Sequence, residues 1–354
     1  MSIHVADRSR SSRRLPAAAP PARFDLSLSE NPFPPLPSVR EAIQLELGRA
    51  NRYPEFLPAR LPGLIADHLG VHPDQVVVGS GATGVAMQIL HTLAGPSAEM
   101  VLGVPTFDGY PIMAAMTGAD LIGIPLDSAG DQDLRTMARA VGDRTRLVVL
   151  CRPHNPTGTL VSKRDLHRFL RAIPARIPVI LDEAYVEFLP TDDRIAPHAL
   201  LARHPNLLLL RTFSKAYGLA GLRIGYALGN PALITRIRRH QLPFGTPTLA
   251  VTAVRASYAA EPELAVRVAR IIEERDSLRA ALRDIGIDAP PSYANFLYLP
   301  GPGVATALRR AGITAKAYPD GSARIAVGDI DAGHAVIDAL RAAAAGQGAD
   351  VRIT

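Results

Sequence analysis

Residues 211–225 read Arg211-Thr212-Phe213-Ser214-Lys215-Ala216-Tyr217-Gly218-Leu219-Ala220-Gly221-Leu222-Arg223-Ile224-Gly225 and directly follow the apolar run Asn206–Leu210. A short, leucine-rich run of this kind predicts a strand buried on both faces of a parallel sheet. Polar residues that follow the carboxyl end of such a strand lie where α/β proteins bind ligands. Because the stretch combines a lysine, Lys215, with hydroxyl groups and an arginine, it predicts a ligand site.

The chain on either side of this stretch alternates short apolar runs with helical patterns. Such alternation predicts an α/β fold, in which a mostly parallel sheet has helices on both faces. Arg223–Leu228 follows without a crossover helix, so we expect it to be an antiparallel strand. The other predicted strands are Gln75–Gly79, Met100–Val104, Leu121–Ile124, Arg146–Cys151, Ile177–Asp182 and Asn206–Arg211.

The character of the sequence changes after about residue 245. A long helical pattern, Pro262–Ile285, precedes predicted strands at Asn295–Leu299, Thr314–Ala317 and Ala323–Val327, which is typical of a small α+β unit. A chain of 354 residues has room for about two domains. We expect a disordered arm over residues 1–25, a large domain over residues 46–245, and a small domain built from residues 26–45 and 246–354.

Composition excludes several classes of protein. The formal net charge is +6, but four arginines fall in the first fourteen residues and no nucleic-acid motif accompanies them, so we expect no nucleic-acid partner. No apolar run approaches the ~20 residues that span a bilayer, and no apolar signal-peptide core is present. One cysteine, Cys151, cannot form an internal disulfide or a multi-cysteine zinc site. We therefore expect a cytoplasmic protein without a metal.

The segment Gly79–Gly84 fits the pattern G-x-G-x-x-G between a predicted strand and a predicted helix. Glycines let the backbone approach a ligand closely, and the free N–H groups of a helix N-terminus bind anions. The segment therefore predicts a phosphate site. The pattern alone leaves open whether the phosphate belongs to a dinucleotide, as in an NAD-dependent dehydrogenase, or to another cofactor.

Three further polar groups follow predicted strands, and together they favour one cofactor, pyridoxal 5′-phosphate. Its aldehyde needs a lysine, for which Lys215 is available. Its ring nitrogen needs a carboxylate, which Asp182 can supply, and its phenolic oxygen needs donors such as Asn155 and Tyr185. Its phosphate needs N–H groups and an arginine, Arg223. Each residue alone has an ordinary structural explanation, whereas the dehydrogenase alternative gives them no joint role.

These residues resemble the motifs of fold type I pyridoxal-phosphate aminotransferases, in the branch of the histidinol-phosphate and aromatic amino acid aminotransferases. The resemblance covers roughly residues 26–345. Its motifs are Ser29-Glu30-Asn31-Pro32, Asn51-Arg52-Tyr53-Pro54-Glu55, Gly81-Ala82-Thr83, Pro105-Thr106-Phe107, Asn155-Pro156-Thr157-Gly158, Asp182-Glu183-Ala184-Tyr185 and Ser214-Lys215-Ala216.

The resemblance implies a seven-stranded sheet in the large domain and a transfer of an amino group to a 2-oxo acid, such as 2-oxoglutarate. It also implies a homodimer with shared active sites and a Schiff base on Lys215, with Lys215, Asp182 and Tyr185 as catalytic residues. The implied cofactor-binding residues are Gly81, Ala82, Thr83, Phe107, Asn155, Asp182, Tyr185, Thr212, Ser214, Lys215 and Arg223, with Tyr53 reaching the partner's site. The implied substrate-binding residues are Arg324, Asn31, Asn295 and Tyr53.

The chain departs from the family pattern at a few positions. His154 stands where an asparagine is frequent, Phe107 stands where a tyrosine is frequent, and the first 35 residues look different. The amino donor therefore stays open between histidinol phosphate and an aromatic amino acid. Another reaction of the same cofactor, such as decarboxylation of an amino acid phosphate, also stays open.

Overall fold

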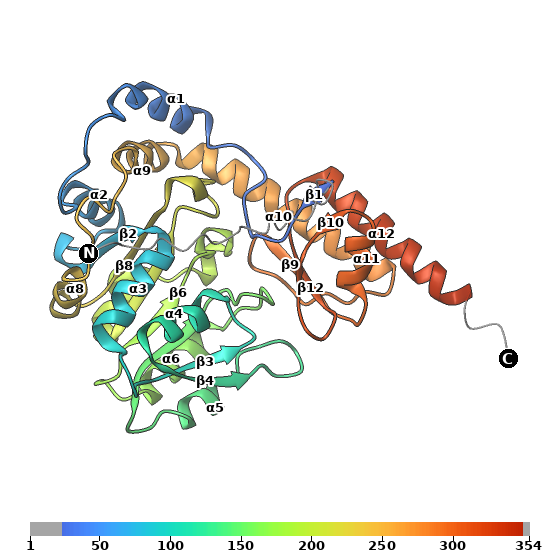
Figure 1. Cartoon of the computed structure of the whole chain (residues 1–354), viewed down its shortest axis with the longest axis horizontal. Coiled ribbons are helices and arrows are strands. Elements are labelled where there is room, and N and C mark those ends of the chain that lie inside the picture. The colour runs from blue at the N-terminus through green and yellow to red at the C-terminus, as the bar shows by residue number, and fades with distance from the viewer. Residues whose placement is uncertain (1–22, 350–354) are drawn as a thin grey trace, which may run out of the picture.

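The computed structural model describes residues 23–349 and is built around a seven-stranded sheet (Figure 1). The spatial order of its strands is β2-β8-β7-β6-β5-β3-β4. Only β8 is antiparallel to its neighbours, β2 and β7, as predicted for a strand without a crossover helix. The strands are β2 (Val76–Ser80), β3 (Glu99–Val104), β4 (Asp120–Pro125), β5 (Thr145–Cys151), β6 (Val179–Asp182), β7 (Leu207–Thr212) and β8 (Ile224–Leu228).

Helices cover both faces of this sheet, so successive residues of a central strand point into two different hydrophobic cores. Leu207 and Leu209 of β7 belong to one core, and Leu208 and Leu210 belong to the other. This two-sided burial explains why the strands read as continuous apolar runs rather than as alternating ones. The helices near the sheet are α3 (Gly81–Leu93), α4 (Gly109–Thr117), α5 (Leu134–Arg139), α6 (Lys163–Ala172), α7 (Pro197–Arg203) and α8 (Pro231–Arg238).

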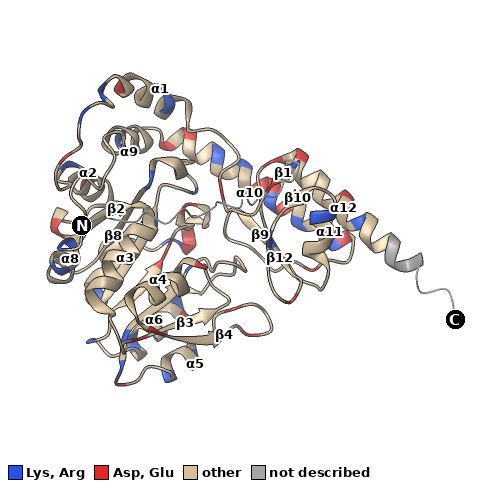
Figure 2. Ribbon diagram, in the orientation of Figure 1, with Lys and Arg blue, Asp and Glu red and all other residues tan. Residues whose placement is uncertain are grey.

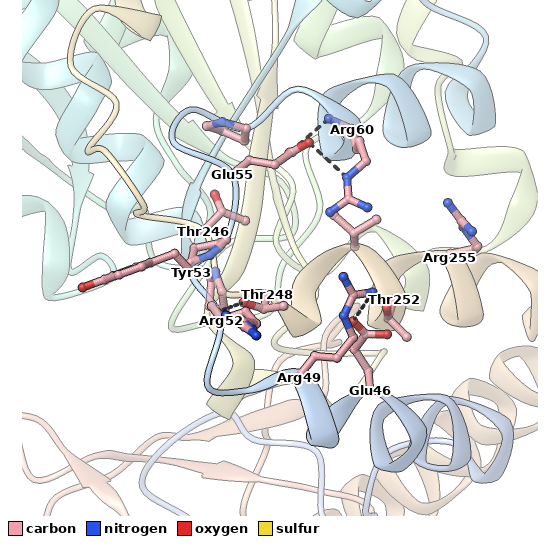
Figure 3. Close-up of a pocket in the computed structure, with 14 residues that line it drawn as sticks. Glu46, Arg49, Arg52, Tyr53, Glu55, Arg60, Thr246, Thr248, Thr252 and Arg255 are labelled. Carbon is pink, nitrogen blue, oxygen red and sulfur yellow. Dashed lines mark hydrogen bonds and ion pairs between the residues drawn. The ribbon is translucent and has the colours of Figure 1, made fainter.

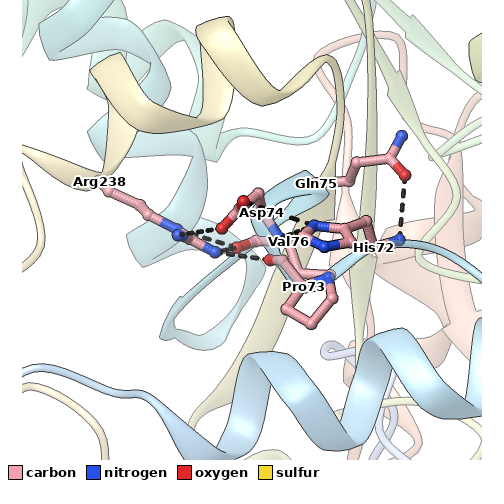
Figure 4. Close-up of polar contacts among 6 residues, drawn as sticks. All are labelled: His72, Pro73, Asp74, Gln75, Val76 and Arg238. Carbon is pink, nitrogen blue, oxygen red and sulfur yellow. Dashed lines mark hydrogen bonds and ion pairs between the residues drawn. The ribbon is translucent and has the colours of Figure 1, made fainter.

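The entry into β2 is fixed by an arginine from α8 (Figure 4). Nη2 of Arg238 donates to the carbonyl oxygens of Pro73 (2.6 Å) and Val76 (2.7 Å), and its guanidinium lies 3.6 Å from the carboxylate of Asp74. The side chain of His72 accepts a hydrogen bond from the N–H of Asp74. These contacts hold the start of the strand whose other end begins the predicted phosphate site.

A smaller α+β unit, on the right in Figure 1, follows the long helix α10 (Glu261–Asp284). Its three-stranded antiparallel sheet has the order β11-β12-β9, with β9 (Phe296–Leu299), β11 (Lys316–Ala317) and β12 (Ala323–Ala326). Helices α11 (Val304–Arg310) and α12 (Ile330–Ala349) complete it. The expected single strand Thr314–Ala317 is wrong, because β10 (Ile313–Thr314) and β11 pair with different strands.

The N-terminal part of the described chain joins this smaller unit first. Strand β1 (Phe24–Asp25) pairs in parallel with β10, so Phe24 and Asp25 are not disordered as expected for the end of the arm; residues 1–22 of the arm lie outside the described residues. The sequence patterns did not predict helices α1 (Pro37–Glu46), α2 (Arg60–Leu69) and α9 (Leu249–Ala259), and both α1 and α2 pack against α9. The domain boundaries stay a prediction. Short 3₁₀ helices occur at Leu47–Arg49, Pro73–Gln75, Val186–Phe188, Thr191–Asp193 and Ala220–Leu222.

Charged residues fall mainly on helices and loops, whereas the central strands carry few (Figure 2). Within residues 23–349, no helix is both long and apolar enough to cross a membrane. The α/β class, the mostly parallel seven-stranded sheet and the added α+β unit are confirmed.

Candidate active site

The carboxyl ends of β2, β5, β6 and β7 meet at one edge of the large sheet, and a cavity of about 740 Å³ lies beside that edge. Residues of the N-terminal segment and of β11 and β12 line the other side of the cavity. Most of the predicted site residues line it: Ala82, Thr83, Phe107, Asn155, Asp182, Tyr185, Thr212, Ser214, Lys215, Arg223 and Arg324. The predicted motifs, scattered along the sequence, therefore converge on one cavity.

Lys215 presents its amine to the N-terminal segment. Nζ donates to the main-chain carbonyl oxygen of Ser29 (2.8 Å) and to the hydroxyl oxygen of the same residue (2.8 Å). Burial, and secondarily the guanidinium of Arg324, lowers the pKa of Lys215 to about 8. With this pKa, roughly a tenth of the amine is neutral, and thus nucleophilic, at pH 7.

Asp182 ends β6 and carries a half-buried carboxylate that is held from two sides. Oδ2 accepts a hydrogen bond from the phenol of Tyr110 (2.7 Å), and Oδ1 accepts one from the N–H of Ala184 (3.1 Å). Burial raises the pKa of Asp182, while the bond from Tyr110 opposes that rise. Such a fixed carboxylate can hold a protonated ring nitrogen in place.

A second hydrogen-bonded group links Tyr185, Asn155 and Arg324. Nδ2 of Asn155 donates to the hydroxyl of Tyr185 (3.2 Å), and Nη1 of Arg324 donates to Oδ1 of Asn155 (2.7 Å). Nη2 of Arg324 donates to the carbonyl of Ser27, whereas its buried Nε has no partner within the described protein. An arginine with a spare donor beside a cavity is suited to a carboxylate.

The end of β2 and the start of α3 form a close-fitting anion cradle. Gly81 has φ +72°, a conformation that favours glycine, and a Cβ atom at this position would lie 2.3 Å from Nη2 of Arg223, whose side chain would have to move. Arg223 itself has φ +53° and directly precedes β8, which brings its guanidinium to the N-terminus of α3. The hydroxyls of Thr212 and Ser214 lie 3.0 Å apart beside it. Free N–H groups, hydroxyls and an arginine together can bind a phosphate.

Three of the predicted residues lie elsewhere. Nδ2 of Asn31 donates to the carbonyls of Lys215 (3.1 Å) and Ala216 (3.0 Å), and Nδ2 of Asn295 donates to the carbonyls of Ser29 and Glu30. Neither asparagine lines the cavity, so a direct contact with substrate stays a prediction for both. Their amides instead fix the backbone around the lysine.

Tyr53 lies at a separate pocket of about 460 Å³ (Figure 3). Its side chain is 84% exposed and extends away from the arginine side chains drawn there. The structure of a single chain does not test the predicted contact of Tyr53 with a partner's site, so this contact stays a prediction.

His154 is fully buried and does not line the cavity. Its Nδ1 lies 2.9 Å from the hydroxyl of Thr157, while Nε2 has no partner within the described protein. Burial lowers the pKa of His154 to about 3, so the imidazole is neutral. It therefore packs behind Asn155 as an uncharged group.

Sequence reasoning assigned no site role to Ser29, Tyr110 or Lys316, all of which line the cavity. Lys316 of β11 forms an ion pair across the cavity with Asp108, next to Phe107. The chain has only three lysines, so Lys316 could have been considered as a site residue from the sequence alone. Ser29 was visible as the first residue of the motif Ser29-Glu30-Asn31-Pro32, whereas Tyr110, within a helix, belongs to no motif.

Comparisons with known proteins agree with this geometry. A family model described as aminotransferase class I and II matches residues 22–333. An aromatic amino acid aminotransferase of Cutibacterium acnes is 46% identical over 274 residues, covering 77% of this chain and 78% of the relative. The aromatic amino acid aminotransferase of Streptomyces avermitilis is 39% identical over 320 residues, with 89% of each chain covered.

A crystal structure of the histidinol-phosphate aminotransferase from Sinorhizobium meliloti, in complex with pyridoxal 5′-phosphate, superposes with a TM-score of 0.82. It is 29% identical to this chain and covers 91% of this chain and 90% of its own. Because a lysine, a carboxylate and an anion cradle meet in one cavity of this fold, and because the family model spans most of the sequence, the chain belongs to the class I and II aminotransferases.

Proposed function

We propose that this aminotransferase binds pyridoxal 5′-phosphate through Lys215 and takes its amino group from an aromatic amino acid. The observation that carries the proposal is the buried amine of Lys215, with a pKa lowered to about 8, in a cavity that also holds the Asp182 carboxylate and the anion cradle. The acceptor is a 2-oxo acid, such as 2-oxoglutarate.

The residues of the cavity fit this cofactor. The space that a Cβ atom of Gly81 would fill is taken by the Arg223 guanidinium, so the cradle is shaped for an anion at the start of α3. Thr212, Ser214 and the N–H groups of Ala82 and Thr83 are available to the phosphate. Asp182 is available to the ring nitrogen, Asn155 and Tyr185 to the phenolic oxygen, and Phe107 to one face of the ring.

When bound, pyridoxal 5′-phosphate supplies an aldehyde for the amine and a ring that takes up the electron pair of the donor's Cα–H bond. Lys215 moves the proton, because its neutral Nζ accepts the proton from Cα and returns it. Asp182 holds a proton at the ring nitrogen. Arg324, which lines the cavity, binds the donor's carboxylate and orients the Cα–H bond.

The choice of an aromatic donor rests on the walls of the cavity and on the relatives. Phe107, Tyr318 and Leu28 line the cavity, which gives an aromatic side chain an apolar surface. The charge of Lys316 is neutralised by Asp108, so this cation is not free for a phosphate group of the substrate. The two relatives compared above are named for aromatic amino acids.

A homodimer is supported by an exposed aromatic cluster beside the pocket at which Tyr53 lies. The rings of Tyr53 and Phe56 lie 4.8 and 5.1 Å from that of Phe244, and all three side chains are exposed in the single chain. Burial of such a cluster against a second copy would remove exposed apolar surface from water. A second copy that covers this cluster would receive Tyr53 at its cofactor phosphate.

We also retain the cytoplasmic location and the domain boundaries expected from sequence as part of this proposal. The lone cysteine, Cys151, is buried and unpaired, which suits a reducing compartment.

A half-reaction tests the proposed activity. Purified holoenzyme is mixed with phenylalanine, tyrosine or histidinol phosphate without an acceptor, and the yellow absorbance band is followed while the oxo product is assayed. We expect phenylalanine and tyrosine to bleach the band and release the corresponding 2-oxo acid. Release of carbon dioxide, or bleaching by histidinol phosphate alone, would overturn the proposal.

A further inference from the structure

The segment Ser27–Asn31 forms part of the cavity wall and is held by hydrogen bonds on both sides. On one side, Nη2 of Arg324 donates to the carbonyl of Ser27 (2.7 Å), and Nδ2 of Asn295 donates to that of Ser29 (3.2 Å). On the other, Nδ2 of Asn31 donates to the main chain at Lys215. The position of Ser29 is therefore set by the fold rather than by a loose loop.

Both oxygens of Ser29 accept hydrogen bonds from the same amine. Its carbonyl oxygen and its hydroxyl oxygen each lie 2.8 Å from Nζ of Lys215. The residue is only 4% exposed, so water does not compete for these bonds. Two acceptors at this distance, in a desolvated place, define one location for the amine.

The hydroxyl of Ser29 also continues the hydrogen bonding away from the lysine. It lies 2.9 Å from the hydroxyl of Tyr185, which accepts from Asn155, which in turn accepts from Arg324. Four consecutive hydrogen bonds thus join the lysine amine to the arginine proposed to bind the substrate carboxylate. Without the hydroxyl of Ser29, these hydrogen bonds would not connect Lys215 to Tyr185, Asn155 and Arg324.

Groups that can only donate determine which way these hydrogen bonds run. The ammonium of Lys215 and the amide Nδ2 of Asn155 can only donate, so the oxygens of Ser29 and Tyr185 accept from them. If the hydroxyl of Ser29 donates to Tyr185, the phenol hydrogen of Tyr185 is left to point into the cavity. That is where the phenolic oxygen of the proposed cofactor would accept it.

We propose that Ser29 is a positioning residue that holds the amine of Lys215 whenever the amine is not bonded to the cofactor, and that its hydroxyl ties the amine to Tyr185. The inference rests on the proposed function, since it assumes that Lys215 bonds an aldehyde. It assigns a role to a side chain in the N-terminal segment, outside the motifs that follow the strands.

Ser29 acts on an amine that several charged groups already influence. They are Arg324 and Arg223, which favour the neutral amine, and Asp182 and Glu30, which favour the ammonium; the phenol of Tyr185 also faces it. Substitution of Ser29 leaves all of them in the chain. A change in the titration of Lys215 on replacing this one hydroxyl is therefore attributable to the hydroxyl.

The test measures uptake of the cofactor rather than turnover. Cofactor-free protein is mixed with pyridoxal 5′-phosphate in a stopped-flow instrument, and the second-order rate of band formation is recorded from pH 6 to pH 10. Only the neutral amine adds to the aldehyde, with loss of water, so the rate rises with pH around the pKa of Lys215. We expect a midpoint near 8 for the unaltered protein.

Ser29→Ala removes an acceptor that favours the ammonium but keeps the carbonyl oxygen. We expect its midpoint to fall by roughly one pH unit, the size of one hydrogen bond to a charged group. Ser29→Thr keeps the hydroxyl and should restore the midpoint. Ser27→Ala, two residues away with its hydroxyl on Asp25, is the matched control and should leave it unchanged.

Unchanged midpoints in Ser29→Ala, or equal shifts in Ser29→Ala and Ser29→Thr, would overturn the role of Ser29 while leaving the proposed function intact. An unaltered protein that forms no band with pyridoxal 5′-phosphate at any pH would instead overturn the proposed function itself. Equal melting temperatures of the variants confirm that folded proteins are compared.

Discussion

The phenol of Tyr110 donates a 2.7 Å hydrogen bond to Oδ2 of Asp182. Tyr110 lies in α4 and Asp182 ends β6, so a helix that packs on the sheet reaches across to the carboxylate at its edge. Tyr110 is buried and Asp182 is half-buried, and the bond favours the ionised carboxylate against the desolvation that raises the pKa of Asp182. Asp182 therefore depends on a residue that belongs to none of the motifs.

Replacement of Tyr110 by phenylalanine should impair catalysis without loss of the fold. The pKa of Asp182 should rise further, because its main opposing hydrogen bond is lost, and the carboxylate should hold the ring nitrogen less firmly. We expect kcat/KM for phenylalanine to fall about tenfold, equivalent to about 1.4 kcal/mol. Tyr258→Phe is the control, since its buried hydroxyl has no partner in the described protein. Equal kcat/KM for both variants would contradict this role.

Lys215→Ala should abolish turnover, because no other amine lines the site except Lys316, which is paired with Asp108. The cofactor should still bind non-covalently through the anion cradle and wash out on dialysis. Steady-state assays and absorbance spectra measure both effects. Lys163→Ala at the start of α6 serves as the lysine control, and substantial activity in Lys215→Ala would refute the assignment.

Arg211→Met should destabilise the protein strongly. Nε and Nη2 of Arg211 both donate to Oε2 of the buried Glu183, and Glu187, with a pKa raised to about 7 by burial, also benefits from this cation. Loss of one partner of a buried pair costs about 3–5 kcal/mol. Urea unfolding should show this decrease, and the double variant Arg211→Met/Glu183→Gln should lose less. Equal losses in the two would mean that the pair is not coupled.

His154 should make the protein less stable in mild acid. Its folded pKa is about 3, whereas an unfolded histidine has a pKa near 6.5, so below that pH only the unfolded chain gains the proton. The stability contribution of the neutral ring is complete above pH 6.5 and is lost as the pH falls towards 3. At pH 5 the loss is about 2 kcal/mol. His154→Asn should lack this component in urea unfolding at pH 7 and pH 5, while His72→Asn, an exposed histidine, should retain it.

Mixed dimers test whether Tyr53 is shared between subunits. Lys215→Ala chains and Tyr53→Ala chains should each have little activity alone. If each site takes Tyr53 from the partner, random mixing restores about a quarter of the native sites. Activity of the co-expressed mixture above the mean of the two parents is the expected result, and no gain would refute the shared site.

The sequence predicted the sheet well because each central strand is buried on both faces. Continuous apolar runs such as Leu207–Leu210 leave little ambiguity, and polar residues after them, Asp182 and Lys215 among them, lie at the expected edge. Helices α1 and α9 were not predicted, because they bury much of their apolar surface against each other rather than against the sheet. Local patterns do not reveal such a pairing between distant segments.

The missed part of the site has a similar cause. Ser29 reaches Lys215 across 186 positions of sequence, and Tyr110 reaches Asp182 across 72. No strand or helix connects these pairs locally, so only the folded chain brings them together. Asn31 and Asn295 illustrate the converse, since their motifs were visible but their amides bond to backbone rather than lining the cavity.

The pairing of β1 with β10 has a consequence for synthesis on the ribosome. Phe24 leaves the ribosome about 290 residues before its partner Ile313 is added. The large sheet, complete by Leu228, can assemble while the N-terminal segment still lacks its partner strand. The N-terminal segment that holds the lysine amine can therefore dock only after the large sheet has formed, and a chain released before β12 would contain Lys215 but lack a complete pocket around it.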